Sequence, residues 1–367
     1  MTEPEFIPGK ELSRRLHAEV VQPLLAKQYP GLAYSAGRWG YGSEVLDFDT
    51  PMSRDHDWGP RLQVFLNEKD MDLKQEIWDM LANELPKTFY GYSTHFGPEN
   101  PDDPGVRHMS IKDGGPVDHR VEVTSLRKFL HAYLPVNVFT RIKEQDWLIL
   151  PAQKLRTIVS GGTFHDGLHV LLPMQEKLRW YPNDVWAYLL ASGFTRIGQE
   201  EHLMGRAGHA GDEIGSAQIG AHLTRTIMLM AFWMEKQYPP YHKWFGTGLE
   251  QLEIAGELIP ALHTIRLADT WQAREQGLVQ AYLTLLRKFN ALGLVEPVAV
   301  KVTDFFGRPF QVIGGGDVAD RLKPLFADTP LADFPLVGSI DLVTSSTDVL
   351  ENNELCTRMR ALYTSEG

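Results

Sequence analysis

Two aspartates that flank a histidine are the first residues whose types and spacing suggest chemistry. Asp55 and Asp57 surround His56 in the stretch YGSEVLDFDTPMSRDHDWGPR, residues 41–61. If this segment is extended, both carboxylates point to the same side, because side chains alternate along a strand. Like charges so close repel each other unless a cation lies between them. Mg²⁺ prefers oxygen ligands and binds one or two carboxylates together with substrate phosphates. The pair therefore predicts a Mg²⁺ site.

Two other features would complete such a site. Glu122 lies on the polar face of the predicted strand RVEVTS and would add a third carboxylate. The alternative for Glu122 is an ordinary salt-bridged surface residue. The turn at Gly42-Ser43 would bring backbone N–H groups and a hydroxyl up to a phosphate, because glycine allows a close approach of the backbone. Together these residues indicate metal-assisted phosphoryl or nucleotidyl transfer.

Other candidates along the chain are weaker. Asp47 and Asp49 form a rival pair, but they follow Ser43 too soon for a turn, a helix and a second strand. We interpret them as loop caps or as groups that support the site. His165 and His169 stand four residues apart, but a histidine pair without a third partner is weak evidence for a metal site.

Two neighbours of the aspartates are not expected to act in the chemistry. His56 has no room on the carboxylate face, so it should pack inward or face the solvent. Trp58 is interpreted as a hydrophobic plug.

Composition limits the classes of protein to consider. The 367 residues are 43% apolar and 23% charged, as in ordinary globular proteins of more than one domain. The net charge of −11 argues against non-specific binding to nucleic acid or to anionic membranes. The single cysteine, Cys356, excludes an internal disulfide and a cysteine zinc site. No stretch approaches the ~20 apolar residues of a spanning helix, and the first residues lack an apolar signal core. We therefore expect a cytoplasmic protein without a membrane partner.

Hydrophobic periodicity predicts the elements that must position these residues. The expected fold class is α+β, with a small mixed sheet and flanking helices, then a mainly helical domain and a short α/β tail. The corresponding domains are 1–150, 151–294 and 295–367. In the first domain we expect helices at 9–27 and 72–85, strands at 62–66 and 120–125, mostly turn at 35–60 and a loop at 97–118. Later helices are expected from 183, at about 212–235, at 249–269 and at 276–293.

The order of these motifs resembles the signature of the DNA polymerase β-like nucleotidyltransferase superfamily. That order is Gly42-Ser43, eleven residues, Asp55-His56-Asp57-Trp58 and later Val121-Glu122-Val123. The stretches SRDHDWGPR and YPPYHKWF are similar to an uncharacterised bacterial and fungal family of predicted nucleotidyltransferases. This likeness runs over most of the chain.

The resemblance implies a role for each matching residue. Asp55 and Asp57 would hold two Mg²⁺ ions, and Glu122 would be a third metal ligand or the general base for an acceptor hydroxyl. Gly42 and Ser43 would contact the triphosphate of the nucleotide.

A further implication concerns the helical domain. In aminoglycoside nucleotidyltransferases such a domain closes over the nucleotide and supplies cations. Arg225 and Lys243 are the candidates here, since Lys or Arg can offset triphosphate charge that the metal ions leave. For Arg225 the alternative is an ion pair with Asp212 or Glu213. For Lys243 the alternative is a helix cap.

The resemblance thus implies a Mg²⁺-dependent nucleotidyltransferase. It would move a nucleoside monophosphate from an NTP, with ATP expected, to an acceptor hydroxyl and release pyrophosphate. The acceptor is a small molecule or a macromolecule, and the acidic composition argues against RNA. Alternatives are a catalytically silent nucleotide-binding protein, an antitoxin- or immunity-like protein that docks on a partner, and a metal-dependent phosphohydrolase.

Overall fold

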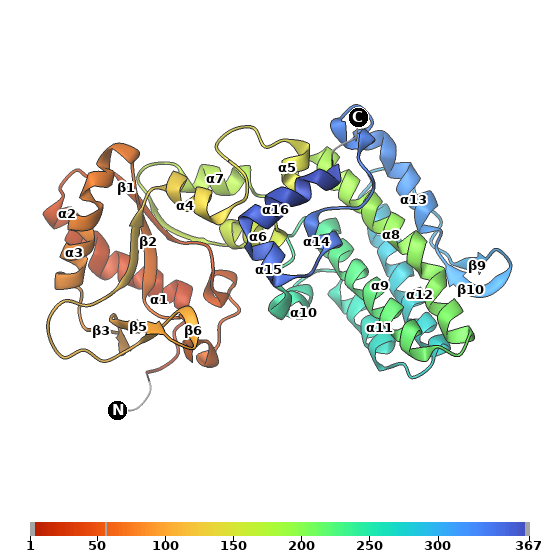
Figure 1. Ribbon diagram of the computed structural model, residues 1–367, viewed down its shortest axis with the longest axis horizontal. Coiled ribbons are helices and arrows are strands. Elements are labelled where there is room, and N and C mark those ends of the chain that lie inside the picture. Colours follow the sequence, from red (N-terminus) through yellow and green to blue (C-terminus); the bar gives the residue numbers. More distant parts are fainter. Residues whose placement is uncertain (1–3, 56, 364–367) are drawn as a thin grey trace. The chain divides into compact units, whose positions relative to one another are not determined.

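The computed structural model describes residues 4–55 and 57–363 (Figure 1). Contacts divide the chain into two compact units. The first comprises Met1–Phe139 with Lys154–Arg179, and the second comprises Thr140–Gln153 with Trp180–Gly367. The chain therefore leaves the first unit and returns to it once. The predicted domain division after residues 150 and 294 stays a prediction.

The first unit is built on a four-stranded mixed sheet. Its strands are β1 (Tyr34–Arg38), β2 (Arg61–Leu66), β7 (Arg120–Thr124) and β8 (Gly162–Asp166), in the order β7-β2-β1-β8. β2 and β7 run parallel, whereas β1 is antiparallel to both β2 and β8. The predicted α+β class with a small mixed sheet is confirmed.

Helices cover one face of this sheet. They are α1 (Gly9–Leu16), a π-helical turn (His17–Val21), α2 (Gln22–Gln28) and α3 (Lys74–Glu84), which follows a 3₁₀ turn at Glu68–Leu73. Leucines and isoleucine of α1 and α3 pack against the apolar side chains of β2 and β7 in one buried core, which includes Leu12, Leu16, Leu62, Val64, Ile77, Leu81, Val121 and Val123. Burial of this face leaves the polar face of the sheet to form a site.

Two expectations for this unit were wrong, and one strand was missed. The described residues of 35–60 are mostly turns and irregular backbone, as expected, but the first four belong to β1, which lies in the middle of the sheet, where both faces are buried and no apolar alternation appears. The stretch 97–118 is not one loop, because β5 (Phe96–Asn100) and β6 (Asp103–Met109) pair antiparallel there. Asp55 is not in an extended segment, since it ends a 3₁₀ helix, Pro51–Asp55.

The other elements of the first unit are short. They are a 3₁₀ turn (Ser43–Leu46), β3 (Thr88–Phe89), β4 (Tyr92–Ser93), α4 (Leu126–Tyr133), most of α6 (Ala152–Val159) and α7 (Leu171–Lys177).

The second unit is mainly helical, as predicted. Four helices, α8 (Asn183–His209), α9 (Glu213–Met234), α11 (Ala255–Leu267) and α12 (Trp271–Ala291), lie side by side (Figure 1). Asp212 caps α9 by accepting a hydrogen bond from the N–H of Gly215 at 2.7 Å. The remaining elements are α5 (Glu144–Leu148), a 3₁₀ turn (His242–Trp244), α10 (Phe245–Leu249), β9 (Thr303–Phe305), β10 (Arg308–Val312), α13 (Gly315–Leu322), 3₁₀ turns at Lys323–Phe326, Pro330–Asp333 and Met359–Tyr363, α14 (Ile340–Val343), α15 (Thr347–Glu351) and α16 (Asn353–Arg358).

Close helix packing in the second unit depends on glycine. A Cβ atom on Gly198 of α8 would lie 2.6 Å from the backbone nitrogen of Gly316 in α13. Only glycine allows the two helices to approach so closely. Among the described residues, no helix combines the length and the apolar character needed to cross a membrane.

Candidate functional site

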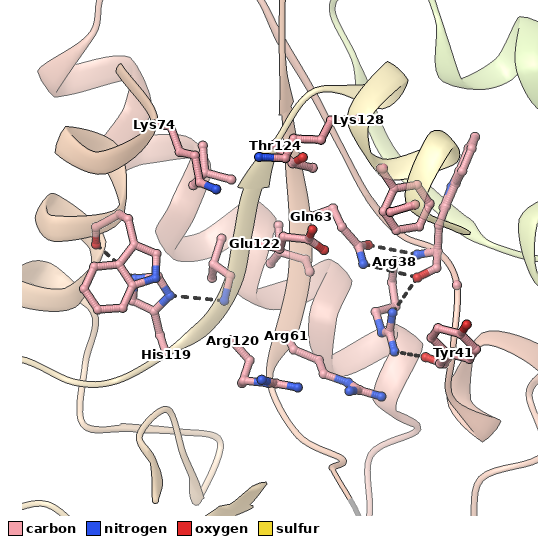
Figure 2. A pocket seen from close by; sticks show the side chains of 18 of the residues that line it. Arg38, Tyr41, Arg61, Gln63, Lys74, His119, Arg120, Glu122, Thr124 and Lys128 are labelled. Atoms are coloured by element: carbon pink, nitrogen blue, oxygen red, sulfur yellow. Dashed lines mark hydrogen bonds between the residues drawn. The ribbon is translucent and has the colours of Figure 1, made fainter. Parts of the chain in front are cut away.

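A cavity of about 830 Å³ lies on the polar face of the sheet in the first unit. The first half of β2, the whole of β7, the start of α3, one side of α4 and the loop after β1 form its walls (Figure 2). The charged side chains of its lining are Arg38, Arg61, Lys74, Arg107, Arg120 and Lys128, with Asp57, Asp118 and Glu122. The cavity is therefore rich in cations although the protein as a whole is acidic.

Strand alternation places Glu122 in this cavity. Val121 and Val123 point into the core, so Arg120, Glu122 and Thr124 lie on the opposite face of β7. Glu122 is exposed, and it makes no hydrogen bond or ion pair with any other side chain that the structure describes. Its carboxylate is available to a ligand.

Asp57 lies in the same cavity, but arginines hold it. Its backbone has a positive φ of 44°, a conformation that aspartate tolerates better than most residues. Arg61 Nη1 donates to its Oδ2 at 2.6 Å. Arg120 Nη2 donates to Oδ1 at 2.8 Å and to Oδ2 at 2.9 Å. Both carboxylate oxygens are therefore engaged.

Glu44 supports the arginines from inside the protein. Its side chain is 2% exposed and lies 2.8 Å from Arg38 Nη2 and 2.7 Å from Arg61 Nη2. Burial alone would raise the pKa of Glu44, but the charges of Arg61 and Arg38 outweigh it and lower the pKa to about 2. Burial lowers the pKa of Arg38 to about 10, with a contribution from the positive charge of Arg61. The sequence analysis missed Glu44.

Side-chain hydrogen bonds fix the loop after β1. Arg38 donates to the carbonyls of Trp39 and Tyr41, and Gln63 bonds both the N–H and the carbonyl of Trp39 (Figure 2). Gly42 has a φ of 133°, and a Cβ atom there would lie 2.3 Å from Oε2 of Glu44. Glycine is thus required beside the buried acid.

The predicted phosphate turn lies beside this loop. Tyr41 lines the cavity, whereas neither Gly42 nor Ser43 is among the described residues of the lining. Ser43 begins the 3₁₀ turn that contains Glu44. The phosphate contacts of Gly42 and Ser43 stay a prediction.

The other aspartates of the opening stretch have structural contacts. Asp49 accepts hydrogen bonds from the N–H of Gly9 at 2.7 Å and from Nε1 of Trp58 at 2.9 Å. Asp47 pairs with Lys10 at 2.7 Å. Trp58 is buried between Phe6 and Tyr92, as expected of a plug. His56 lies outside the described residues.

The two cationic candidates of the helical region belong to the second unit. Arg225, on α9, donates to the carbonyl of Asp341 at 3.0 Å and lies 3.3 Å from Nε2 of His242. In the described part of the chain, Arg225 makes no ion pair with Asp212 or Glu213, and Glu213 instead pairs with Arg274 at 3.2 Å. Lys243 is exposed and lies over the ring of Trp244. Their contact with a nucleotide stays a prediction.

The predicted three-carboxylate centre stays a prediction, because the side chain of Asp55 lies outside the part of the chain that the structure describes. Both oxygens of Asp57 accept guanidinium N–H groups, which leaves Glu122 as the available acid. In the described part of the chain, no group of three or more His, Cys, Asp or Glu residues is arranged to hold a metal ion. His165 packs against the rings of Tyr34 and His17. Carboxylate oxygens suit Mg²⁺ in type, but Asp57 can bind the ion only after its oxygens leave Arg61 and Arg120.

Sequence reasoning missed the arginines as well as Glu44. Arg120 directly precedes Val-Glu-Val, and the alternation that exposes Glu122 also exposes Arg120. The same rule places Arg61 and Gln63 together on β2. Period-two alternation was therefore the signal that identifies these side chains.

Comparisons with known proteins give limited matches. Residues 147–245 match a domain of unknown function, DUF4037. Among solved structures, the chain is similar to a nucleotidyltransferase-like protein from Exiguobacterium sibiricum, with 12% identity, 78% of each chain covered and a TM-score of 0.33. No curated protein matches the chain. The cavity, lined by residues from Arg38 to Tyr133, lies outside the segment that matches DUF4037.

Proposed function

We propose that the protein is a nucleotidyltransferase whose cavity on the polar face of the sheet binds the triphosphate of an NTP, with ATP expected. One observation carries the proposal: the available carboxylate of Glu122 lies in a cavity with six cationic side chains. Guanidinium and ammonium groups are the usual partners of phosphate oxygens. The order of the motifs resembles that of polymerase β-like nucleotidyltransferases and supports transfer to an acceptor hydroxyl.

In this proposal Glu122 takes the proton of the acceptor hydroxyl. The acceptor oxygen then forms a bond to the α-phosphorus while the bond from that phosphorus to the bridging oxygen breaks, and pyrophosphate leaves. Arg61, Arg120, Lys74 and Lys128 offset the negative charge of the phosphates. The proposal includes Mg²⁺, which Asp55, Asp57 and Glu122 would hold. Asp57 would first have to give up its hydrogen bonds to Arg61 and Arg120.

The test uses each of the four NTPs with an α-label, Mg²⁺ and a panel of small hydroxyl compounds, with label transfer and pyrophosphate release as readouts. Glu122→Gln should lower both rates by about 10²–10⁴-fold, because a general base typically contributes that much. Asp57→Asn should abolish transfer. Full activity of either variant, or no transfer from any of the four NTPs, would contradict the proposal.

A matched control is available in the same unit. Glu99 is also an exposed strand glutamate, on β5, and it is not among the described residues that line the cavity. Glu99→Gln should retain full activity. Thermal unfolding of each variant checks that the fold is kept.

One observation favours a second function, a catalytically silent nucleotide-binding protein. The arginine pairs of Asp57 are compatible with anion binding without chemistry. ATP binding in calorimetry without pyrophosphate release would favour this alternative.

A further inference from the structure

The lining of the cavity carries an excess of positive charge. Six basic side chains stand against three acidic ones, an excess of three in a protein whose net charge is −11. Counting the buried Glu44 behind the lining reduces the excess to two. Such a local surplus attracts a ligand with several negative charges.

Two of these cations lie directly opposite each other. Arg61 and Arg120 are register partners on the parallel strands β2 and β7. Like charges in opposing positions of a sheet destabilise it. An anion between the two guanidinium groups offsets their repulsion, and Asp57 supplies it at 2.6–2.9 Å. Figure 2 shows the two arginine side chains next to each other at the edge of the cavity.

Arg61 is held in place independently of Asp57. Arg61 is anchored by Nε and Nη2 to Glu44, at 3.1 and 2.7 Å, so its Nη1 is directed to Asp57. Asp57 stands in the turn before β2, and its side chain is 21% exposed. A phosphate group offers guanidinium the same planar set of paired acceptors as a carboxylate.

We infer that Asp57 is an internal substitute for a phosphate group, and that a polyphosphate chain binds to Arg61 and Arg120 without a metal ion by displacing Asp57. The inference rests on the proposed function for one point only, namely that the natural ligand is an NTP. Because the binding-competent state requires the arginines to be free of Asp57, the intact pairs lower the apparent affinity for the ligand. Displacement of Asp57 also releases the carboxylate that the proposed reaction requires.

The test measures binding of inorganic tripolyphosphate to the full-length protein by titration calorimetry in EDTA. Asp57→Asn should tighten binding about tenfold, because removal of the competing carboxylate leaves both arginines available. Arg120→Gln should weaken binding about tenfold, because one of the two guanidinium partners is lost. No detectable binding to the wild type and to Asp57→Asn would overturn the inference.

Asp118→Asn is the matched control. Asp118 lines the same cavity and pairs with Arg107, whose guanidinium is also held by the carbonyls of Gly97 and Phe96. This substitution removes the same charge from the same cavity, and it should change the affinity by less than about twofold. Equal tightening in Asp118→Asn and Asp57→Asn would overturn the inference, because it would show a general charge effect.

The result is separable from the proposed function. Asp57→Asn is expected to bind tripolyphosphate more tightly in EDTA and to lose nucleotidyl transfer with Mg²⁺, so the two ideas predict effects of opposite sign. If Asp57→Asn does not fold, the wild type and Arg120→Gln are compared by the rise of their Tm with tripolyphosphate. A smaller rise in Arg120→Gln supports the inference, and equal rises overturn it.

Discussion

Glu44 is the buried residue on which the arginine side of the cavity depends. It accepts from both Arg38 and Arg61, and Arg61 in turn reaches Asp57. Removal of one partner from a buried ion pair leaves an uncompensated charge in the protein interior and costs roughly 3–5 kcal/mol. The proposed site therefore rests on an acid that is not among the described residues of the cavity lining.

Glu44 should also make the stability of the protein depend on pH. Its pKa is lowered to about 2 in the folded state from an ordinary value of 4.5, so its contribution is present above about pH 4.5 and is lost as the pH falls toward 2. The shift corresponds to about 3 kcal/mol. We expect Glu44→Gln to unfold at lower urea concentration at pH 7 and to show a smaller loss of stability between pH 5 and pH 3 than the wild type. Urea unfolding at each pH measures both effects, and parallel pH profiles of the two proteins would contradict this role of Glu44.

At the scale of elements, Asp166 joins β8 to the helix that follows. Its carboxylate accepts hydrogen bonds from the backbone N–H groups of Val170, Leu171 and Leu172 at 3.0–3.1 Å, and from the hydroxyl of Ser35 on β1 at 2.8 Å. One side chain thus fixes the start of α7 and the edge of the sheet.

Asp166→Ala should destabilise the protein by about 2 kcal/mol, because several hydrogen bonds to a carboxylate are lost at a helix start. Chemical denaturation measures the change. Asp79→Ala is the control, since Asp79 lies exposed within α3 and accepts from Gln75 at 3.0 Å. It should change the free energy of unfolding by less than about 0.5 kcal/mol. Similar losses in both variants would mean that Asp166 is not a special cap.

The elements differ in how far the sequence predicts them. β2 follows from its short apolar run, β7 follows from its alternating pattern, and the long helices follow from their periodicity. β1 does not, because YSAGR is buried throughout and contains a glycine, so it lacks a one-sided pattern. The Glu122 position follows from alternation, whereas the contact of Glu44 with Arg61 joins residues that are 17 positions apart and depends on the folded loop. Local sequence patterns therefore show which side chains share one face of an element. They do not show which side chains of different elements contact each other.

At the scale of the molecule, the first unit is discontinuous in sequence. Its strand β8 follows a segment, Thr140–Gln153, that belongs to the second unit. β8 provides the partner for one edge of β1 across the register Ser35↔Asp166 to Arg38↔Gly162. A fragment that ends at residue 150 therefore lacks one of the four strands.

We expect a fragment of residues 1–179 to unfold cooperatively and a fragment of residues 1–150 not to do so. The shorter fragment leaves an edge of β1 without a partner and removes the capping contact between Ser35 and Asp166. Circular dichroism during heating compares the two fragments with the full chain. A cooperative transition of the shorter fragment at the same temperature would show that β8 is dispensable.

The late position of β8 has a consequence for synthesis of the protein. β2 ends at Leu66 and β8 ends at Asp166, one hundred residues later. At roughly 5–20 residues per second, the ribosome needs about 5–20 s to make that interval. During this time the nascent chain presents the unpaired backbone groups of β1, so an incomplete sheet is exposed to other chains and to chaperones while translation continues.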